Sequence, residues 1–375
     1  MGHVRLPTLY VKPPSWARGN GKYGPVAPTH EQDWARFTAK VAKAYARSHP
    51  DRTRNVYQIT WEPDRNWDNW DGDDASLVRL HELAYKAIHE ADSRAEVIGP
   101  AISPMWAIAG DYGRYGSEAR GFLSAGGAPF VDGFAVHPYF DEATGARKHA
   151  WLGITRLNWP SQYRARMNKF LTMWYLAKGT HARFYGTEVG LVLLNEENSS
   201  GPDLLHQARF DVIQFLEFLG LGAELNFGFY DVDWDIGKNT FEKGQHRGYY
   251  YNLDKVGWGS RIMSPKPVAP AYAACSWFLE GHTSRGPIAG LLGESYGYVF
   301  QRGADTVLAA WDSAATHEVA LDVSPIKTPT VVIYDWMGNR IQSKAVADGR
   351  AKVMLGPSPI YIKSGTDTPA TVPLR

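Results

Sequence analysis

The sequence predicts an α/β fold, a TIM-type (β/α) barrel followed by a small antiparallel β-domain. Short apolar runs alternate with amphipathic helical segments from residue 6 to about residue 280. This alternation is typical of parallel strands joined by crossover helices. From about residue 286 the pattern changes to short alternating strands separated by turn residues. The length of 375 residues fits a barrel of roughly 250 residues plus a small second domain.

Six apolar runs are the candidate barrel strands. They are Leu6–Lys12, Val56–Glu62, Ala95–Ala101, Val131–His137, Arg183–Glu188 and Leu225–Tyr230. The clearest helical segments between them are Glu31–Ser48 and Asp203–Leu219. In the first segment, four large residues recur at helical spacing and are expected to face the sheet as core: Trp34, Phe37, Val41 and Tyr45.

A complete barrel needs eight strands, so two strands are not accounted for. Two explanations stay open: two βα units precede this sequence, or the barrel is open or completed by another chain. We therefore predict an open, crescent-like sheet with edges at Leu6–Lys12 and Leu225–Tyr230. Such edges present unpaired backbone groups and favour association.

The C-terminal region contains six short strand candidates. They are GYVFQR, TVLAAWD, HEVALDV, TVVIYDWMG, AKVMLG and PIYIKSG. Their alternating pattern predicts a small antiparallel β-domain with a sandwich-like core. The expected organisation is a barrel over residues 1–282, an accessory β-domain over residues 283–365 and a disordered tail over residues 366–375.

The composition narrows the possible partners. The net charge is +1, which gives no reason to expect nucleic acid or an anionic membrane as the main partner. The single cysteine, Cys275, excludes an internal disulfide and lies in an apolar stretch, so we expect a buried thiol. No run is long enough to span a membrane. The first residues show no signal-peptide pattern, and a secreted or periplasmic location is favoured if an upstream leader has been lost.

Two glutamates end predicted strands. Glu62 ends VYQITWE and is followed by Pro63, and Glu188 ends ARFYGTE and is followed by Val189 and Gly190. In a parallel barrel, catalytic residues gather at the C-terminal ends of the strands. Cleavage of a glycosidic bond needs two carboxyl groups that flank one acetal. A single strand-end glutamate is often a structural salt-bridge partner, but two in one barrel favour a catalytic pair.

Other residues at the same rim are candidates for binding substrate. His137 ends the fourth run and Tyr139 lies just after it, although a lone histidine of this kind is often a satisfied core residue. Tyr230 ends the last run and is followed by Asp231, Asp233 and Trp234, while Lys12 ends the first run and is followed by Trp16. Aromatic residues make up 13% of the chain, including 14 tryptophans, and several lie in loops where flat rings can stack on sugars.

The segment Asp64–Ser76 combines Trp67 and Trp70 with five aspartates. We expect it to form a substrate-facing rim, with Trp67 as a binding residue. A calcium site is the minority alternative, since Asp68, Asp71, Asp73 and Asp74 offer oxygen ligands. Their spacing does not match a helix–loop–helix calcium loop, so we expect no metal and no cofactor.

The segments TWEPD, FAVHPYF, YGTEVG and SPKPVAPAYAACSWFLEG resemble those of clan A glycoside hydrolases. LYVKPPSWA and the C-terminal SPIYIKSG are most similar to glycoside hydrolase family 39 and related exopolysaccharide hydrolases. The resemblance covers nearly the whole chain. It implies that Glu62 is the general acid/base and Glu188 the nucleophile. It also makes Leu6–Lys12 the third barrel strand, which would account for the count of six.

One position departs from this resemblance. The clan usually has an asparagine before the acid/base glutamate, where its amide binds the 2-hydroxyl of the sugar. This chain has Trp61 there, and we expect Trp61 to contact the substrate. An indole offers one donor and no acceptor. Three explanations stay open: the 2-position is recognised differently, the sugar is unusual, or the activity is weakened.

The sequence therefore predicts a retaining hydrolase of β-glycosidic bonds in an oligo- or polysaccharide, acting through a two-carboxylate double displacement. Two alternatives remain: a non-catalytic carbohydrate-binding protein derived from a barrel hydrolase, and an inverting hydrolase. A carbohydrate is the expected partner in each case. The sequence leaves the oligomeric state open.

Overall fold

A computed structural model describes residues 6–10, 12–63, 70–102, 117–138, 159–179, 183–190, 201–228, 231–233, 248–253 and 262–365. The chain divides into two compact units. The first comprises residues 1–140 and 163–188, and the second comprises residues 141–162 and 189–375. None of the helices in these described residues is long and apolar enough to cross a bilayer.

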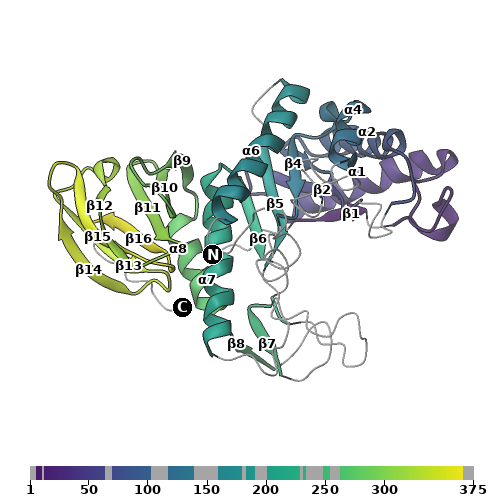
Figure 1. Ribbon diagram of the computed structural model, residues 1–375. Coiled ribbons are helices and arrows are strands. Elements are labelled where there is room, and N and C mark those ends of the chain that lie inside the picture. Colours follow the sequence, from purple (N-terminus) through teal and green to yellow (C-terminus); the bar gives the residue numbers. More distant parts are fainter. Residues whose placement is uncertain are drawn as a thin grey trace. The chain divides into compact units, whose positions relative to one another are not determined.

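The first unit contains parallel strands with helices between them (Figure 1). Its strands are β1 (Thr8–Tyr10), β2 (Asn55–Thr60), β3 (Ala95–Ile98), β4 (Gly133–Val136) and β5 (Arg183–Val189). Its helices are α1 (Glu31–Ser48), α2 (Asp74–Ala91), α4 (Ser117–Ser124) and, from residue 163 onward, α6 (Trp159–Lys178). Three short 3-10 turns join them: η1 (Ser15–Ala17), η2 (Pro28–His30) and η5 (Ala128–Phe130).

Strands β1 to β5 pair in sequence order, and each pair is parallel. This order is typical of a barrel wall, whereas a doubly wound sheet reverses its order at a switch point. The strands curl into a half-barrel, which confirms the predicted fold class. Each of the five overlaps a predicted run, and β2 ends at Thr60, two residues before the predicted end.

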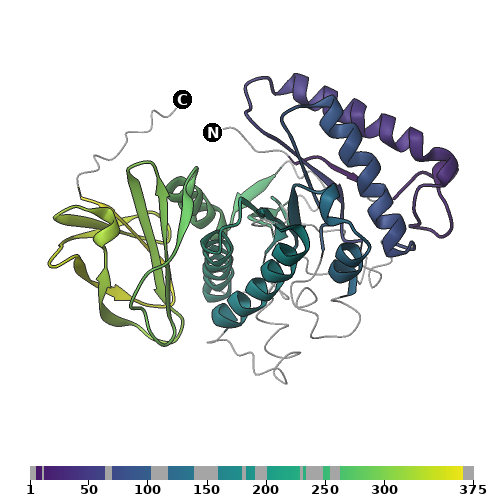
Figure 2. The ribbon, with the colours of Figure 1, turned by 90° about the horizontal axis from the view of Figure 1, so that it is seen from above.

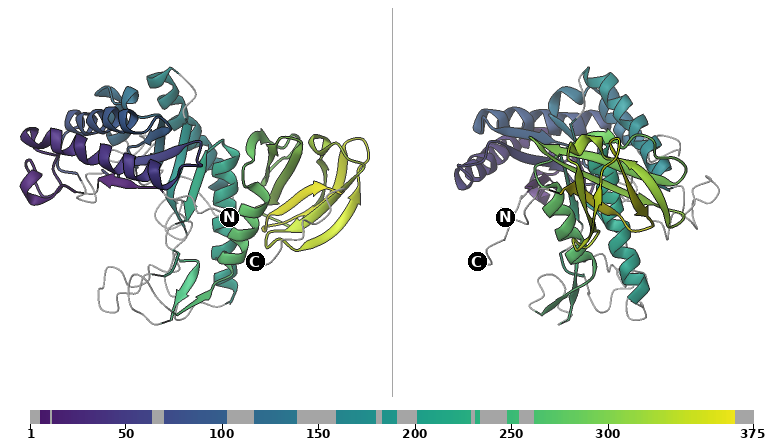
Figure 3. Two further views of the ribbon diagram at one scale, coloured as in Figure 1. Left: turned by 180° about the vertical axis from the view of Figure 1, so that it is seen from behind. Right: turned by 90° about the vertical axis from the view of Figure 1, so that its left-hand side faces the viewer.

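Helices α1 and α2 pack side by side along the strands (Figure 3, left). Helix α1 begins and ends as the apolar periodicity predicts, but its buried stripe is Trp34, Thr38 and Ala42. The prediction that Phe37 is core was wrong: its exposed fraction is 48%, because it lies one residue off that stripe. At the end of α1, Arg94 donates to the carbonyl oxygens of Ala46 (3.0 Å), His49 (3.1 Å) and Arg52 (2.7 Å). These bonds satisfy acceptors that a helix end leaves open.

The second unit contains α7 (Gly201–Gly220) and β6 (Leu225–Gly228). The hairpin of β7 (Tyr250–Asn252) and β8 (Met263–Pro265) and helix α8 (Val268–Leu279) follow. Antiparallel strands make up the rest. They are β9 (Thr283–Pro287), β10 (Ser295–Arg302), β11 (Asp305–Asp312), β12 (His317–Asp322), β13 (Thr330–Asp335), β14 (Arg340–Ala345), β15 (Arg350–Leu355) and β16 (Ile360–Ser364), with the 3-10 turn η8 (Ser324–Ile326).

The C-terminal strands form a six-stranded sheet in the order β14-β13-β16-β11-β10-β9 and a β12-β15 pair (Figure 2, green to yellow). Leu308 and Ile362 from the large sheet and Val353 from the pair share one buried apolar cluster. The predicted antiparallel region is therefore confirmed. Sequence reading missed β9 and β14, whose residues alternate between intermediate and exposed and so carry little apolar signal.

Candidate active site

Three buried polar side chains meet at the carboxyl-terminal edge of the parallel sheet in the first unit. Glu62 lies two residues after β2, His137 directly follows β4, and Glu188 is the penultimate residue of β5. Their exposed fractions are 8%, 0% and 7%. The carboxyl ends of neighbouring parallel strands meet at one edge, so three runs far apart in the sequence deliver their polar ends to one place.

The distances within this cluster are short. His137 Nδ1 lies 2.6 Å from Glu62 Oε1 and 3.6 Å from Glu188 Oε2. One ligand atom from each of the three residues lies within 4.8 Å of the other two. The histidine ring thus lies between two carboxyl groups. Two carboxylates this close repel each other when both are ionised, and a proton shared among the three groups lowers that energy.

The backbone at Glu62 has an unusual conformation. Its φ is 42°, in the left-handed region that non-glycine residues seldom adopt. The Glu62 N–H donates to Ala101 O at 2.8 Å, and Pro63 prevents the strand from continuing. Strained residues of this kind cost roughly 1–3 kcal/mol and cluster at active sites. Here the turn directs the Glu62 side chain to His137.

Trp61 lies against the other carboxylate. Its indole Nε1–H donates to Glu188 Oε2 at 2.9 Å, and its ring centroid is 6.3 Å from that of His137. The side chain is half-buried. The sequence predicted Trp61 as a substrate contact, and the structure adds a direct bond to Glu188. The replacement of the usual asparagine marked this position, but nothing in the sequence indicated which way the indole points.

The three residues of this cluster are of types that bind metal ions, but the distance between His137 and Glu62 is that of a hydrogen bond. Glutamate and histidine are zinc ligands, and ligand atoms around a tetrahedral zinc ion lie about 3.3 Å apart, given metal–ligand bonds of about 2.0–2.1 Å. The His137–Glu62 separation of 2.6 Å is shorter than this and is typical of a charge-assisted hydrogen bond. The geometry therefore favours proton sharing at this pair.

A buried histidine lies beside the end of β2. His81 of α2 is fully buried, and its Nε2 lies 3.4 Å from Thr60 Oγ1. Burial lowers the pKa of His81 to about 3, so the ring is neutral at physiological pH. Gly99 makes room for it, because a Cβ at residue 99 would lie 2.5 Å from the imidazole Cε1.

The other predicted site residues are only partly described. Trp16 in η1 is 65% exposed, with its ring edge-on to His30 at 5.2 Å, and Lys12 lies 5.8 Å from the Tyr23 ring. Within the described ranges, neither makes a hydrogen bond, ion pair or ring contact with the Glu62–His137–Glu188 cluster. The remaining four predicted residues lie outside the described residues: Tyr139, Tyr230, Trp234 and Trp67.

Two of the four aspartates that suggested calcium bond to backbone amides, and a third, Asp68, lies outside the described residues. Asp73 is the N-cap of α2 and accepts from Ser76 N at 2.8 Å, and Asp71 accepts from Tyr23 N at 2.7 Å. Asp74 opens the first turn of α2. Capping by aspartate satisfies open helical N–H groups. Two of the four proposed ligands are therefore bonded to backbone amides.

Asp233, which follows the last predicted strand, is buried in the second unit. Its carboxylate accepts from Lys266 Nζ at 2.7 Å and from Gly248 N at 2.9 Å. The Lys266 ammonium also lies 5.1 Å from the Tyr251 ring centroid. Such a paired and hydrogen-bonded charge fixes the chain around the β7–β8 hairpin.

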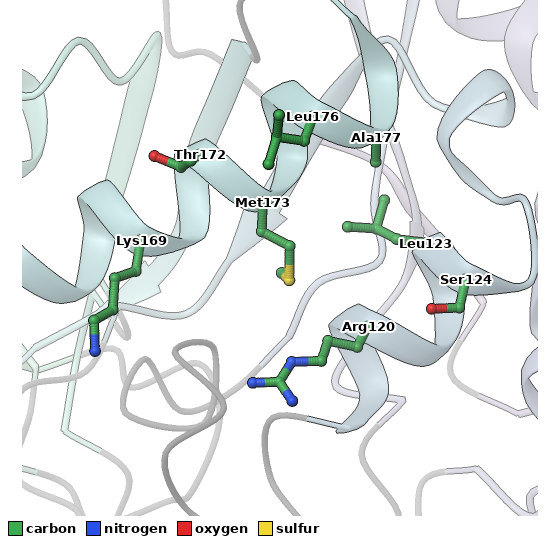
Figure 4. Close-up of a pocket in the computed structure, with 8 residues that line it drawn as sticks. All are labelled: Arg120, Leu123, Ser124, Lys169, Thr172, Met173, Leu176 and Ala177. Atoms are coloured by element: carbon green, nitrogen blue, oxygen red, sulfur yellow. The ribbon is translucent and has the colours of Figure 1, made fainter.

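A groove of about 520 Å³ lies between α4 and α6 (Figure 4). Its lining is mainly apolar, with two cationic side chains at its margin. The lining residues are Arg120, Leu123, Ser124, Lys169, Thr172, Met173, Leu176 and Ala177. None of these belongs to the Glu62–His137–Glu188 cluster.

No family model and no curated protein matches the sequence. Solved structures do match. A family 39 glycoside hydrolase from the gut symbiont Bacteroides cellulosilyticus WH2 is 18% identical with a TM-score of 0.56, over 92% of this chain and 64% of that one. A family 30 endoxylanase from Clostridium papyrosolvens C71 is 12% identical with a TM-score of 0.59, over 94% and 77%. A conserved exported protein from Bacteroides fragilis is 16% identical with a TM-score of 0.62, over 90% and 70%.

The chain has the fold of these glycoside hydrolases. This likeness confirms, at the level of fold, the resemblance to clan A glycoside hydrolases that the sequence predicted. The matching structures include a protein of family 39, the family that the sequence resembled most. The chain spans less than two thirds of the length of that family 39 protein.

Proposed function

We propose that the chain is a retaining glycoside hydrolase that cleaves β-glycosidic bonds, with Glu188 as nucleophile and Glu62 as general acid/base. The observation that carries this proposal is the separation of the two glutamates. An oxygen of Glu62 lies within 4.8 Å of an oxygen of Glu188. Retaining enzymes hold their carboxyl groups about 5–5.5 Å apart, and inverting enzymes about 6.5–9.5 Å apart. This upper limit for the nearest oxygens lies well below the inverting range, which supports direct attack rather than a water held between the carboxyl groups.

The mechanism has two steps. The Glu188 carboxylate attacks the anomeric carbon, and the bond to the leaving oxygen breaks as that oxygen takes the proton of Glu62. Water then attacks the glycosyl ester, the Glu62 carboxylate takes a proton from this water, and the Glu188 carboxylate leaves. His137, hydrogen-bonded to Glu62, holds that side chain through both changes of protonation. No cofactor enters these steps.

The substrate in this proposal is an oligo- or polysaccharide. The predicted contacts are Trp61, His137, Tyr139, Tyr230, Trp234, Trp16, Lys12 and Trp67. Exposed Trp16 offers a flat face on which a sugar ring can stack. Residues 1–282 are the catalytic domain and residues 283–365 an accessory β-domain, with the boundary between α8 and β9.

The test compares two variants on aryl β-glycosides of sugars found active in a polysaccharide screen. Glu188→Gln should lose turnover on every leaving group, because no nucleophile remains. Glu62→Ala should lose far less with an activated leaving group, and azide should partly restore it and yield a β-glycosyl azide. Glu318→Gln, an exposed glutamate on β12, is the matched control and should keep full activity.

Proton NMR of the first-formed sugar decides the stereochemistry: the β-anomer is expected, and the α-anomer would show inversion. If neither glutamate variant changes turnover, the catalytic assignment is wrong. If the protein binds polysaccharide without cleaving any, it is a binding protein on a hydrolase fold. Loss of activity on treatment with EDTA would contradict the metal-free mechanism.

A further inference from the structure

The contact between Trp61 and Glu188 has a consequence for substrate choice. A carboxylate that attacks the anomeric carbon uses one oxygen, and its second oxygen stays beside the sugar. In the structure, Glu188 Oε2 receives the indole N–H at 2.9 Å and lies 3.6 Å from His137 Nδ1. Because the indole N–H is bonded to Oε2, we assign Oε2 as the second oxygen and Oε1 as the attacking oxygen.

The second oxygen of a nucleophile ordinarily has one partner on the sugar. The anomeric carbon has two ring neighbours, the ring oxygen, which carries no hydrogen, and C2, which carries a hydroxyl. Only the 2-hydroxyl can donate to the second carboxylate oxygen. Hydrogen bonds to this hydroxyl strengthen in the transition state of glycoside hydrolysis. An enzyme that depends on them discriminates strongly at C2.

Trp61 changes this arrangement. Its indole offers one N–H and no acceptor, and that N–H is directed at Glu188 Oε2. It has no second donor for the sugar and no acceptor to orient the 2-hydroxyl. A bulky ring also occupies the space beside the nucleophile, with its centroid 6.3 Å from that of His137.

We propose that Trp61 is a positioning residue that supplies, from the protein, the hydrogen bond to Glu188 Oε2 that a 2-hydroxyl would otherwise supply. The enzyme therefore acts on β-glycosides with little selectivity at C2. This inference rests on the proposed function for its catalytic consequence. The hydrogen bond itself can be tested without turnover.

The first experiment follows the indole resonances of ¹⁵N-labelled protein by NMR. The signal missing from Trp61→Phe identifies the Trp61 Nε1–H. In Glu188→Ala this signal should move upfield, because the carboxylate acceptor is gone. The Trp277 signal, from a half-exposed tryptophan on α8, is the control and should stay in place. An unchanged Trp61 signal would overturn the proposal.

The second experiment measures kcat/KM for the 4-nitrophenyl β-glycosides of D-glucose, D-mannose and 2-deoxy-D-arabino-hexose, which differ only at C2, and for the matching galactose series. For the wild type, the kcat/KM values of the three substrates in whichever series is cleaved should agree within about tenfold. In Trp61→Phe the indole donor to Oε2 is lost and the bond from the 2-hydroxyl gains in weight, so the ratio of the glucoside to the 2-deoxy compound should rise at least tenfold. Trp277→Phe should leave the ratio unchanged.

The outcomes separate the two proposals. A wild-type preference of more than about a hundredfold for one C2 configuration, which is about 2.7 kcal/mol of transition-state binding, would overturn the role of Trp61 while leaving the hydrolase intact. An equal fall of all three substrates in Trp61→Phe would also overturn it, since it would show a merely structural role. Failure to cleave any glycoside would overturn the proposed function and the C2 inference together, while the indole signal would still report the hydrogen bond.

Discussion

The two ends of the parallel sheet in the first unit both bury glutamate, but in opposite electrostatic settings. At the amino-terminal end, Glu96 of β3 lies 3.1 Å from Arg54 Nη1 and 3.0 Å from Arg183 Nη1, and it accepts from the Tyr185 hydroxyl. One negative charge there faces two positive ones. At the carboxyl-terminal end, two carboxyl groups face one histidine and one indole N–H.

This difference is the one expected between a stabilising cluster and the catalytic cluster that we propose. A buried carboxylate that is paired with two arginines and a hydroxyl belongs to a structural ion-pair cluster, and removing it would destabilise the fold. Two carboxyl groups that share a histidine can exchange protons, which an acid/base mechanism requires. The same division is general in barrels, where the C-terminal face carries chemistry and the opposite face carries stability.

The largest expected effect is the loss of activity in Glu188→Gln. We expect kcat/KM to fall by at least about 10⁴-fold, as is typical when one member of a catalytic unit is removed. Its free energy of unfolding should stay within about 1 kcal/mol of the wild type, because the change removes one of two repelling charges. Turnover assays and urea denaturation of the same preparation measure both. A large loss of stability in Glu188→Gln would show that the carboxyl-terminal cluster stabilises the fold, as the Glu96 cluster does.

The reverse result is expected for Glu96→Ala. Glu96 is buried, but the Arg54 and Arg183 side chains are 36% and 53% exposed, so removing the carboxylate should cost about 1–3 kcal/mol, as for a lost hydrogen bond to a charged group. Unfolding in urea should show this loss, while kcat per folded molecule stays within about threefold, since Glu96 lies at the other end of the strands. Glu96→Gln keeps an acceptor for Tyr185 and should lose less. If Glu96→Ala lowered kcat without lowering stability, the assignment of chemistry to one end of the sheet and stability to the other would be wrong.

His137→Ala should have an intermediate effect on activity. The variant removes the 2.6 Å hydrogen bond to Glu62. A hydrogen bond to a charged group contributes about 1.5–3 kcal/mol, so kcat/KM should fall roughly tenfold to a hundredfold. The loss should be greater with poor leaving groups, which depend on the acid. Equal losses across leaving groups would indicate that His137 does not act through Glu62.

The smallest effect concerns His81 and pH. Burial lowers its folded-state pKa to about 3, below the unfolded value of about 6.5. Between these values the unfolded chain binds more protons, so stability is complete above about pH 6.5 and falls as the pH is lowered, by up to about 1.4 kcal/mol per pH unit. Urea denaturation from pH 7 to pH 5 should give a shallower slope for His81→Gln than for the wild type. Equal slopes would mean that His81 titrates normally.

The sequence predicted those features that depend on local patterns. The runs that became β1 to β5, helix α1 and both strand-end glutamates follow from periodicity and from the residues that end strands. The pairing of Glu62 with His137 follows only from the strand order, which brings β2 and β4 to the same edge. Phe37 was misplaced because helical spacing fixes a face only to within about one residue.

The directions in which side chains point could not be predicted from the sequence. Trp61 was expected to contact substrate, and the bond from its indole to Glu188 depends on the turn after β2. The arginines around Glu96 were also missed, because Arg54 and Arg183 are 129 positions apart and meet only through the pairing of strands. Charged residues at strand beginnings give no signal until their neighbours in space are known.

At Glu62 the backbone conformation favours one kind of residue and the proposed acid/base role requires another. Glycine or asparagine would adopt a φ of 42° at lower cost, and either would remove the carboxyl group. A population of variants selected only for thermal resistance would therefore accumulate Glu62→Gly or Glu62→Asn, and each such gain would come with loss of the acid. On the proposed function, glutamate at this position gives up backbone stability in return for an acid/base group.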